Sequence, residues 1–283
     1  MGVMRMNNDY TEKLKTLGAR AAYLVGVLYE QGKPVFSNAD VMEITGLEPK
    51  SARNFVASLV KRGVAARLKR GLFILVPYEL GFERVYMGNP YVIARELANR
   101  KNYYISHGSA MDIHQMVTQP QLKVYASVTQ PIRPRFVLGV EFFFVRCKPQ
   151  HFFGVEDHWV TKTEKVRVSD PERTVIDGLR LPQYCGGISE AAKGLWIKKD
   201  EIDLARLVDY ALRLDIGAVI RRLGFLLETF GLGSDAHIAV LRQRLTDSYA
   251  LLDPVLPYEG KYLARWRLRL NIAPDELFSL VST

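Results

Sequence analysis

The segment over residues 49–62 constrains the fold of this chain more than any other. Pro49 suits the first position of a helix, and Gly63 follows at its end. Between them, apolar side chains recur at helical spacing along one face, at Ala52, Phe55, Val56, Leu59 and Val60. The opposite face is basic and hydrogen-bonding around a small residue, and consists of Lys50, Arg53, Asn54, Ala57, Ser58 and Lys61. The pattern predicts an amphipathic helix that packs one face on a core and leaves the other free for a polar partner.

Two more helices are predicted before this segment. Apolar periodicity predicts a helix over residues 11–31 and a short helix over residues 39–45. Ser37 or Asn38 can cap the short helix, and Gly46 suits its end. The short helix, the turn after it and the amphipathic helix together have the form of a helix-turn-helix.

A basic hairpin is predicted directly after the amphipathic helix. Two apolar segments, 64–68 and 72–76, flank the sequence Lys69-Arg70-Gly71, which is typical of a hairpin turn. A basic hairpin in this position is the wing of a winged helix. We therefore expect a winged helix-turn-helix over residues 1–85.

Most of the net charge of this 283-residue chain, +9, is concentrated in the same region. Residues 49–78 contain no Asp or Glu but seven basic residues, namely Lys50, Arg53, Lys61, Arg62, Arg67, Lys69 and Arg70. A localised basic patch is the electrostatic footprint of nucleic-acid binding, whereas solvated protein faces usually mix both signs of charge. The alternative is a three-helix module with a solvated basic face that binds another protein.

Double-stranded DNA is the predicted partner of this domain. The N-terminal half of a recognition helix normally faces the bases, which places Lys50, Ser51, Arg53 and Asn54 there. Arg53 can hydrogen-bond guanine and Asn54 adenine in a bidentate manner. The remaining basic side chains are expected on phosphate, where they set affinity and register: Lys61, Arg62, Arg67, Lys69 and Arg70.

The rest of the chain, residues 86–283, predicts a mixed α/β domain, which makes the whole an α+β protein. Residues 120–168 are rich in strand patterns separated by Pro and Gly, and residues 170–245 are helical. Ser169 or Asp170 can cap the first of these helices, with Pro171 at its first position. The further helices are expected over residues 188–195, 203–214, 218–230 and 235–245.

Several motifs in the second domain suggest a family. They are the sequences from Tyr103 to Ala110 with His114, from Ser169 to Asp177, from Tyr184 to Gly187, from Ile220 to Glu228 and from Trp266 to Asn271. In this order, and after a winged helix, they resemble the AbiEi-type antitoxins of bacterial abortive-infection systems for phage defence. The resemblance spans most of the chain and rests on the order and spacing of the motifs together.

The resemblance implies a type IV toxin–antitoxin system in the cytoplasm. The winged helix would bind inverted repeats in the promoter of its own operon and repress it. The second domain would neutralise a cognate nucleotidyltransferase-like toxin without forming a stable complex with it. The oligomeric state stays open. A rival interpretation is a ligand-responsive winged-helix transcription factor with no antitoxin role.

An enzyme is the other rival. Cys147, His151, His158 and Cys185 lack the short paired spacings that structural zinc sites usually show, so we expect no metal site. Two cysteines form no disulfide framework and are expected as reduced thiols. The carboxylates that a DNA-targeted nuclease would need lack a tight spacing, and they are Glu141, Asp157, Glu164 and Asp170. We therefore expect neither catalysis nor a cofactor, and with no apolar stretch of about 20 residues we expect no membrane span.

Arginines form a second basic group in the C-terminal domain, and they are Arg221, Arg222, Arg242, Arg244, Arg265, Arg267 and Arg269. In a strand, residues 265, 267 and 269 would point to one face. The group predicts a secondary basic surface that extends the DNA footprint or binds RNA or the nucleotide substrate of the toxin.

Overall fold

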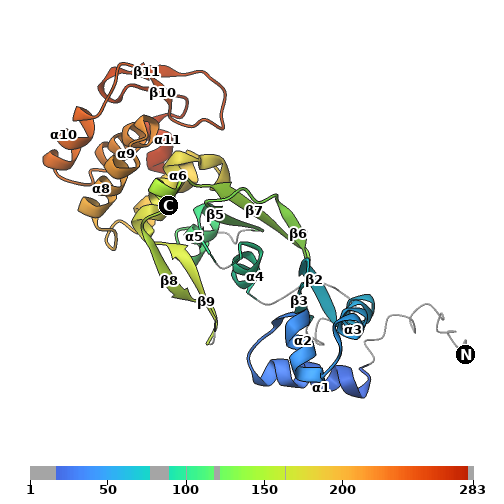
Figure 1. Ribbon diagram of the computed structural model, residues 1–283. Coiled ribbons are helices and arrows are strands. Elements are labelled where there is room, and N and C mark those ends of the chain that lie inside the picture. Colours follow the sequence, from blue (N-terminus) through green and yellow to red (C-terminus); the bar gives the residue numbers. More distant parts are fainter. Residues whose placement is uncertain (1–16, 77–88, 100, 118–121, 163, 280–283) are drawn as a thin grey trace, which may run out of the picture.

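The computed structural model describes residues 17–76, 89–99, 101–117, 122–162 and 164–279. It is elongated, with the N-terminal helices at one end, a twisted sheet in the middle and a helical layer with a small sheet at the other end (Figure 1). Within the described residues, none of the helices has the length and apolar character needed to cross a membrane. The predicted boundary between the two domains, at residue 85, lies outside the described residues.

The N-terminal region has the predicted order of elements with one additional strand. Its elements are α1 (Ala19–Glu30), β1 (Val35–Ser37), α2 (Asn38–Thr45), α3 (Pro49–Lys61), β2 (Ala65–Lys69) and β3 (Leu72–Leu75). Ser37 caps α2 in a capping box with Asp40, and Gly46 ends it in the left-handed conformation. The predicted residues 11–16 of the first helix lie outside the described residues.

The sheet β1-β3-β2 is buried on both faces. Along β3, Phe73 and Leu75 pack among the helices of the winged helix, whereas Ile74 packs on the opposite side with α4 (Pro90–Leu97). Neighbouring side chains on a strand alternate between faces, so burial on both sides explains the continuous apolar run at 72–76. The wing is therefore packed against the second domain over its outer face.

A six-stranded mixed sheet in the order β6-β7-β5-β4-β9-β8 forms the centre of the second domain. Its strands are β4 (Tyr103–Ile105), β5 (Lys123–Val128), β6 (Arg135–Val137), β7 (Val140–Arg146), β8 (Val155–Trp159) and β9 (Lys165–Ser169). The central strand β4 is antiparallel to β5 and parallel to β9. Helix α4 packs against the sheet, and α5 (His107–Ile113) follows β4 directly. The predicted β-rich region is thus a single sheet.

The helical layer begins at α6 and continues to the end of the described chain. Its helices are α6 (Pro171–Arg180), α7 (Ile188–Ile197), α8 (Leu204–Leu214), α9 (Gly217–Thr229), α10 (Asp235–Gln243) and α11 (Pro274–Ser279). A small sheet lies between α10 and α11, made of β10 (Ala250–Leu251), β11 (Lys261–Leu263) and β12 (Leu268–Leu270). The chain also has three short 3₁₀ helices among the described residues, η3 (Pro149–His151), η4 (Pro182–Tyr184) and η5 (Ala264–Trp266).

Helix α9 is central to this layer, and its burial corrects one prediction. Every residue from 221 to 227 is buried, and a Cβ added at Gly224 would lie 2.1 Å from the Trp266 ring. Arg221 and Arg222 are only 3% and 4% exposed, so they are not part of a basic surface. Arg221 donates to the carbonyl oxygens of Thr246 and Ser248. Arg222 donates to backbone carbonyls as well, at Leu179 and Leu251, and burial lowers its pKa to about 10.

Candidate nucleic-acid interface

Helix α3 divides into a buried and an exposed face as its sequence predicts. Ala52, Val56 and Leu59 are buried in the core of the winged helix. The predicted contact residues of the helix lie on the other side and are exposed, and they are Lys50, Ser51, Arg53, Asn54 and Lys61. Ala57 and Ser58 lie among them, also exposed, so no bulky apolar side chain stands on this face.

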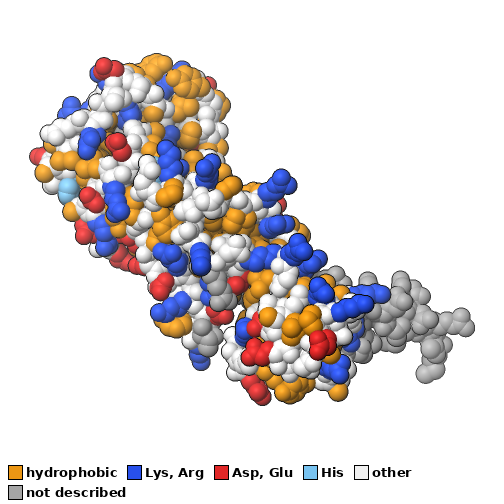
Figure 2. Space-filling model, viewed as in Figure 1, with side chains coloured by type: hydrophobic (Ala, Val, Ile, Leu, Met, Phe, Trp, Pro, Cys, Tyr) orange, Lys and Arg blue, Asp and Glu red, His pale blue; other side chains and the backbone are white. Residues whose placement is uncertain are grey.

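The charge of this face is positive. Helix α3 contains no Asp or Glu. Lys and Arg side chains crowd the part of the N-terminal lobe where α3 and the wing lie, and the Asp and Glu side chains visible on this lobe lie mostly over α1 and α2 (Figure 2). An exposed helix with unopposed positive charge and small central residues can enter a major groove without steric or electrostatic hindrance.

The wing exposes fewer basic side chains than its sequence suggests. Its turn is short, at Arg70 and Gly71, and the side chains of Arg67 and Arg70 are exposed. The ammonium group of Lys69 instead donates to the carbonyl of Glu96 and to Oδ1 of Asn99, both at the C-terminal end of α4. In this structure Lys69 therefore joins the wing to the second domain. Arg62, at the end of α3, is half-buried.

The hairpin of β6 and β7 lies next to this interface, and sequence reasoning missed it. A cavity of about 310 Å³ separates the end of α3 and β2, at Gly63 and Arg67, from Phe136 and Leu138 of the hairpin. Two basic side chains, Arg133 and Arg135, are exposed just before and on β6. The sequence carries no local signal that would bring them close to the winged helix, because the approach depends on tertiary packing.

Comparison with known families finds a match within the N-terminal region. Residues 28–76 match the family described as transcriptional regulator, AbiEi antitoxin. The matched residues run from the last turn of α1 to the end of the wing, so they include α2, α3 and all three strands of the small sheet. They contain every side chain predicted to contact DNA.

The fold of the whole chain also has a relative. A crystal structure of the RV2827C protein from Mycobacterium tuberculosis is similar over 96% of this chain and 97% of that one, with a TM-score of 0.68 and 14% sequence identity. At this identity the match concerns the fold alone. No curated protein matches the chain.

The domain that follows the AbiEi region has its own polar cluster, at its centre. Arg173 and Asp177 form an ion pair of 3.0 Å with 0% and 1% of their side chains exposed. Tyr104 joins them, since its hydroxyl donates to Asp177 at 3.1 Å and accepts from Arg173 at 3.0 Å. Burial acts to raise the pKa of the Asp177 carboxyl, but the guanidinium of Arg173 holds it below its ordinary value. The ion pair is therefore an element of the core.

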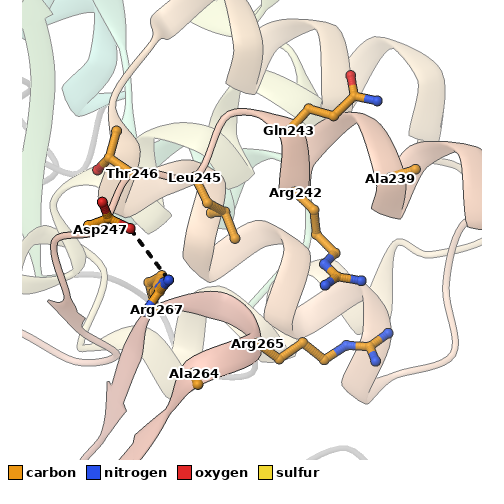
Figure 3. Close-up of a pocket in the computed structure, with 9 residues that line it drawn as sticks. All are labelled: Ala239, Arg242, Gln243, Leu245, Thr246, Asp247, Ala264, Arg265 and Arg267. Atoms are coloured by element: carbon orange, nitrogen blue, oxygen red, sulfur yellow. Dashed lines mark hydrogen bonds and ion pairs between the residues drawn. The ribbon is translucent and has the colours of Figure 1, made fainter.

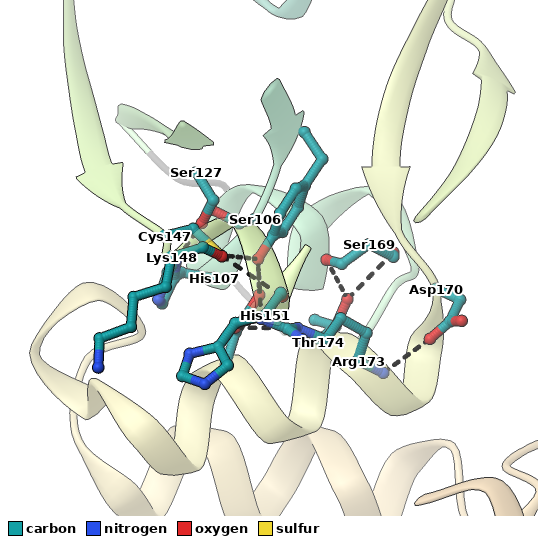
Figure 4. A network of polar contacts seen from close by, with 12 residues as sticks. Ser106, His107, Ser127, Cys147, Lys148, His151, Ser169, Asp170, Arg173 and Thr174 are labelled. Atoms are coloured by element: carbon teal, nitrogen blue, oxygen red, sulfur yellow. Dashed lines mark hydrogen bonds and ion pairs between the residues drawn. The ribbon is translucent and has the colours of Figure 1, made fainter. Parts of the chain in front are cut away.

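Buried side chains extend this cluster on both sides (Figure 4). His107 is fully buried, its Nδ1 lies 2.8 Å from Oγ of Ser106, and burial lowers its pKa from 6.5 to about 4. On the other side, Oγ of Ser169 lies 2.8 Å from Oγ1 of Thr174. These side chains belong to the interior of the domain.

The residues weighed for a metal or nuclease site are dispersed. In the part of the chain that the structure describes, no group of three or more His, Cys, Asp or Glu could hold a metal ion. Cys147 and Cys185 are free and buried, and burial raises the pKa of both thiols. Asp170 caps α6, accepting from the amide of Arg173 at 2.7 Å. The other carboxylates have separate surroundings, with Glu141 paired to Lys123, Glu164 paired to Arg95, and Asp157 exposed on β8.

The arginines near the C-terminus do not line one face of a strand, contrary to expectation. Arg265 lies in η5, where it pairs with Glu228. Arg267 follows in the left-handed conformation, and Arg269 on β12 lies over the rings of Tyr258 and Tyr262. The alternation predicted for a strand is broken by the 3₁₀ turn.

Proposed function

We propose that this protein is a transcriptional regulator that binds double-stranded DNA by inserting α3 into the major groove. The observation that carries the proposal is the exposed face of α3, which is basic and hydrogen-bonding and has no acidic residue. The match of residues 28–76 to AbiEi transcriptional regulators supports it.

The side chains divide by role within this proposal. Arg53 and Asn54, in the N-terminal half of α3, contact base edges, together with Lys50 and Ser51. Lys61 at the end of α3 and the wing residues Arg67 and Arg70 contact phosphate, with Arg62 beside them. Lys69 is not part of this set because its ammonium binds α4.

The biological role that we infer is that of an antitoxin. The protein represses its own operon at inverted repeats, and the domain after the winged helix neutralises a cognate nucleotidyltransferase-like toxin without a stable complex. The AbiEi family description, which names both a regulator and an antitoxin, supports this pairing of roles. We place the protein in the cytoplasm, because its proposed partners are DNA and a toxin of the same cell.

The test of DNA binding is a gel shift with the DNA upstream of the protein's own gene at about 150 mM salt. We expect a specific complex with this duplex that a shuffled duplex of equal length does not form. The double variant Arg53→Ala with Asn54→Ala should abolish the preference, whereas Arg244→Ala, on an exposed residue at the far end of the molecule, should not. Equal binding of both duplexes by the unaltered protein would refute the proposal.

The antitoxin role needs a separate test, because DNA binding alone would suit a plain transcription factor. The neighbouring toxin-like gene is expressed from an unrelated promoter together with the full chain. We expect the Arg53→Ala, Asn54→Ala variant to rescue growth as well as the unaltered protein does. If neither protein rescues growth, the antitoxin role is wrong while the regulator role stands or falls by the gel shift.

A further inference from the structure

A cavity of about 500 Å³ lies at the end of the molecule opposite α3, between α10 and the segment of η5 and β12 (Figures 1 and 3). Three arginines line it from different elements. Arg242 comes from the last turn of α10, Arg265 from η5 and Arg267 from the residue that follows η5. In the close-up, Arg242 extends from α10 toward Arg265, and Arg267 closes the other side next to Asp247.

The positive charge of this cavity is only partly compensated. Arg265 is paired with Glu228, whose other oxygen accepts from the indole of Trp266 at 2.8 Å. Arg267 lies 3.4 Å from Asp247, a fully exposed carboxylate that screens it weakly. Within the described residues, Arg242 has no hydrogen bond or ion pair, so its guanidinium is available to a ligand.

A fourth arginine, buried beneath the cavity wall, adds to the positive potential of the cavity. Arg221 is buried and donates to Thr246, a residue of the cavity wall. Burial lowers the pKa of Arg221, and so does the positive charge of Arg267, which repels that of Arg221. A bound anion would relieve this repulsion.

The backbone at Arg267 is also unusual. Its φ of 50° is in the left-handed region, which a long side chain rarely adopts. This conformation follows directly after η5 and sets the guanidinium on the cavity. Strain of this kind persists only where the surroundings impose it.

We propose that this cavity binds a di- or triphosphate group, carried by a free nucleotide or by inorganic polyphosphate. Guanidinium groups match phosphate oxygens in a bidentate manner, and the volume is in the range of small-molecule sites. The side-chain amide of Gln243 lies in the same wall as a further hydrogen-bonding group. Because the cavity is at the opposite end from α3, this site goes beyond the proposed DNA interface and does not depend on it.

The test is isothermal titration calorimetry of the full chain with ATP, GTP and inorganic triphosphate in about 100 mM salt. We expect all three to bind. Arg242→Gln should weaken binding about tenfold, because one charge-assisted contact is lost. The matched control is Arg244→Gln, which removes the same charge from an exposed residue that does not line the cavity and should change affinity less than twofold.

The three probes also distinguish the source of the phosphate. Tighter binding of a nucleotide than of inorganic triphosphate assigns the site to nucleotides, and equal affinity assigns it to the phosphate group alone. Absence of binding, or equal loss in Arg242→Gln and Arg244→Gln, overturns the site itself. Binding of single-stranded RNA that depends on Arg242, with no binding of the three small probes, overturns it in favour of a nucleic-acid surface.

Discussion

The outward face of α3 and the interior cluster around Arg173 are both rich in polar side chains on a helix, yet these side chains have different roles. On α3 the side chains of Arg53 and Asn54 are exposed and surrounded by water. In the cluster, Arg173 and Asp177 are buried and bonded to each other and to Tyr104. A polar group that a partner within the fold already satisfies contributes to stability, whereas one left exposed is available for a ligand.

The largest effect that this contrast predicts is on stability. Asp177→Ala would leave the guanidinium of Arg173 buried without its counter-charge, which costs about 3–5 kcal/mol. Urea denaturation followed by circular dichroism measures the loss. The exposed Glu201, which pairs with Lys198, provides the control, and Glu201→Ala should cost less than about 1 kcal/mol. Similar losses in the two variants would show that burial does not distinguish the pairs.

On the exposed face of α3, the expected effect is on the recognition of DNA sequence. Arg53→Ala should cost about 1–3 kcal/mol of discrimination at one base pair, because a bidentate contact to a base edge is lost. Affinities for the operator and for single-base variants of it, measured by fluorescence anisotropy, give the discrimination. The free energy of unfolding should stay within about 0.5 kcal/mol, since the side chain is exposed. An equal loss of affinity on all duplexes would move Arg53 from base contact to phosphate contact.

The sequence predicted the exposed polar side chains better than the polar side chains that are bound within the fold. The exposed face of α3 was predictable because periodicity and the glycine and proline residues around it are local signals. The start of α6 at Pro171, capped by Asp170, was predictable for the same reason. The resemblance to the AbiEi family is confirmed by the match of residues 28–76, which lies in the winged helix and does not reach the motifs of the second domain.

The errors concern side chains whose surroundings are made by distant segments. Arg221 and Arg222 have the composition of a surface pair, but α9 is covered on all sides and their guanidinium groups bind backbone carbonyls far along the chain. The ammonium of Lys69 is engaged by α4 in a similar way. Only the fold determines whether a basic residue meets solvent or a carbonyl oxygen.

His107, next to the interior cluster around Arg173, also predicts a pH dependence of stability. His107 has a pKa of about 4 in the fold against 6.5 in the unfolded chain, so the unfolded state takes up the proton first as the pH falls. Stability is therefore complete above pH 6.5 and is lost toward pH 4, by about 2 kcal/mol between pH 7 and pH 5. Asp177 does not act in this window, because its lowered pKa affects stability only below its ordinary value of 3.8.

The variant His107→Asn isolates this contribution. Asn tolerates the left-handed conformation of this position, where φ is 53°, and does not titrate. His107 faces Ser106, Asp177, Arg173, Arg180 and the ring of Tyr184. The difference between the two proteins in urea unfolding, measured at pH 7 and pH 5, should shrink by about 2 kcal/mol at the lower pH. Parallel curves would show that the histidine is protonated or solvated in the fold.

The smallest effect is expected at the wing, where an exposed basic residue and a basic residue bound within the fold are neighbours in the sequence. Arg70 is exposed and Lys69 is bound to α4, although both were predicted to contact phosphate. Arg70→Ala should flatten the slope of log affinity against log salt by about 1, the value for one phosphate contact. Lys69→Ala should leave that slope unchanged and lower the free energy of unfolding by about 1 kcal/mol instead, because it removes hydrogen bonds between the wing and α4. If the two variants flatten the slope equally, Lys69 releases α4 when DNA binds, and the division between satisfied and available side chains fails at this position.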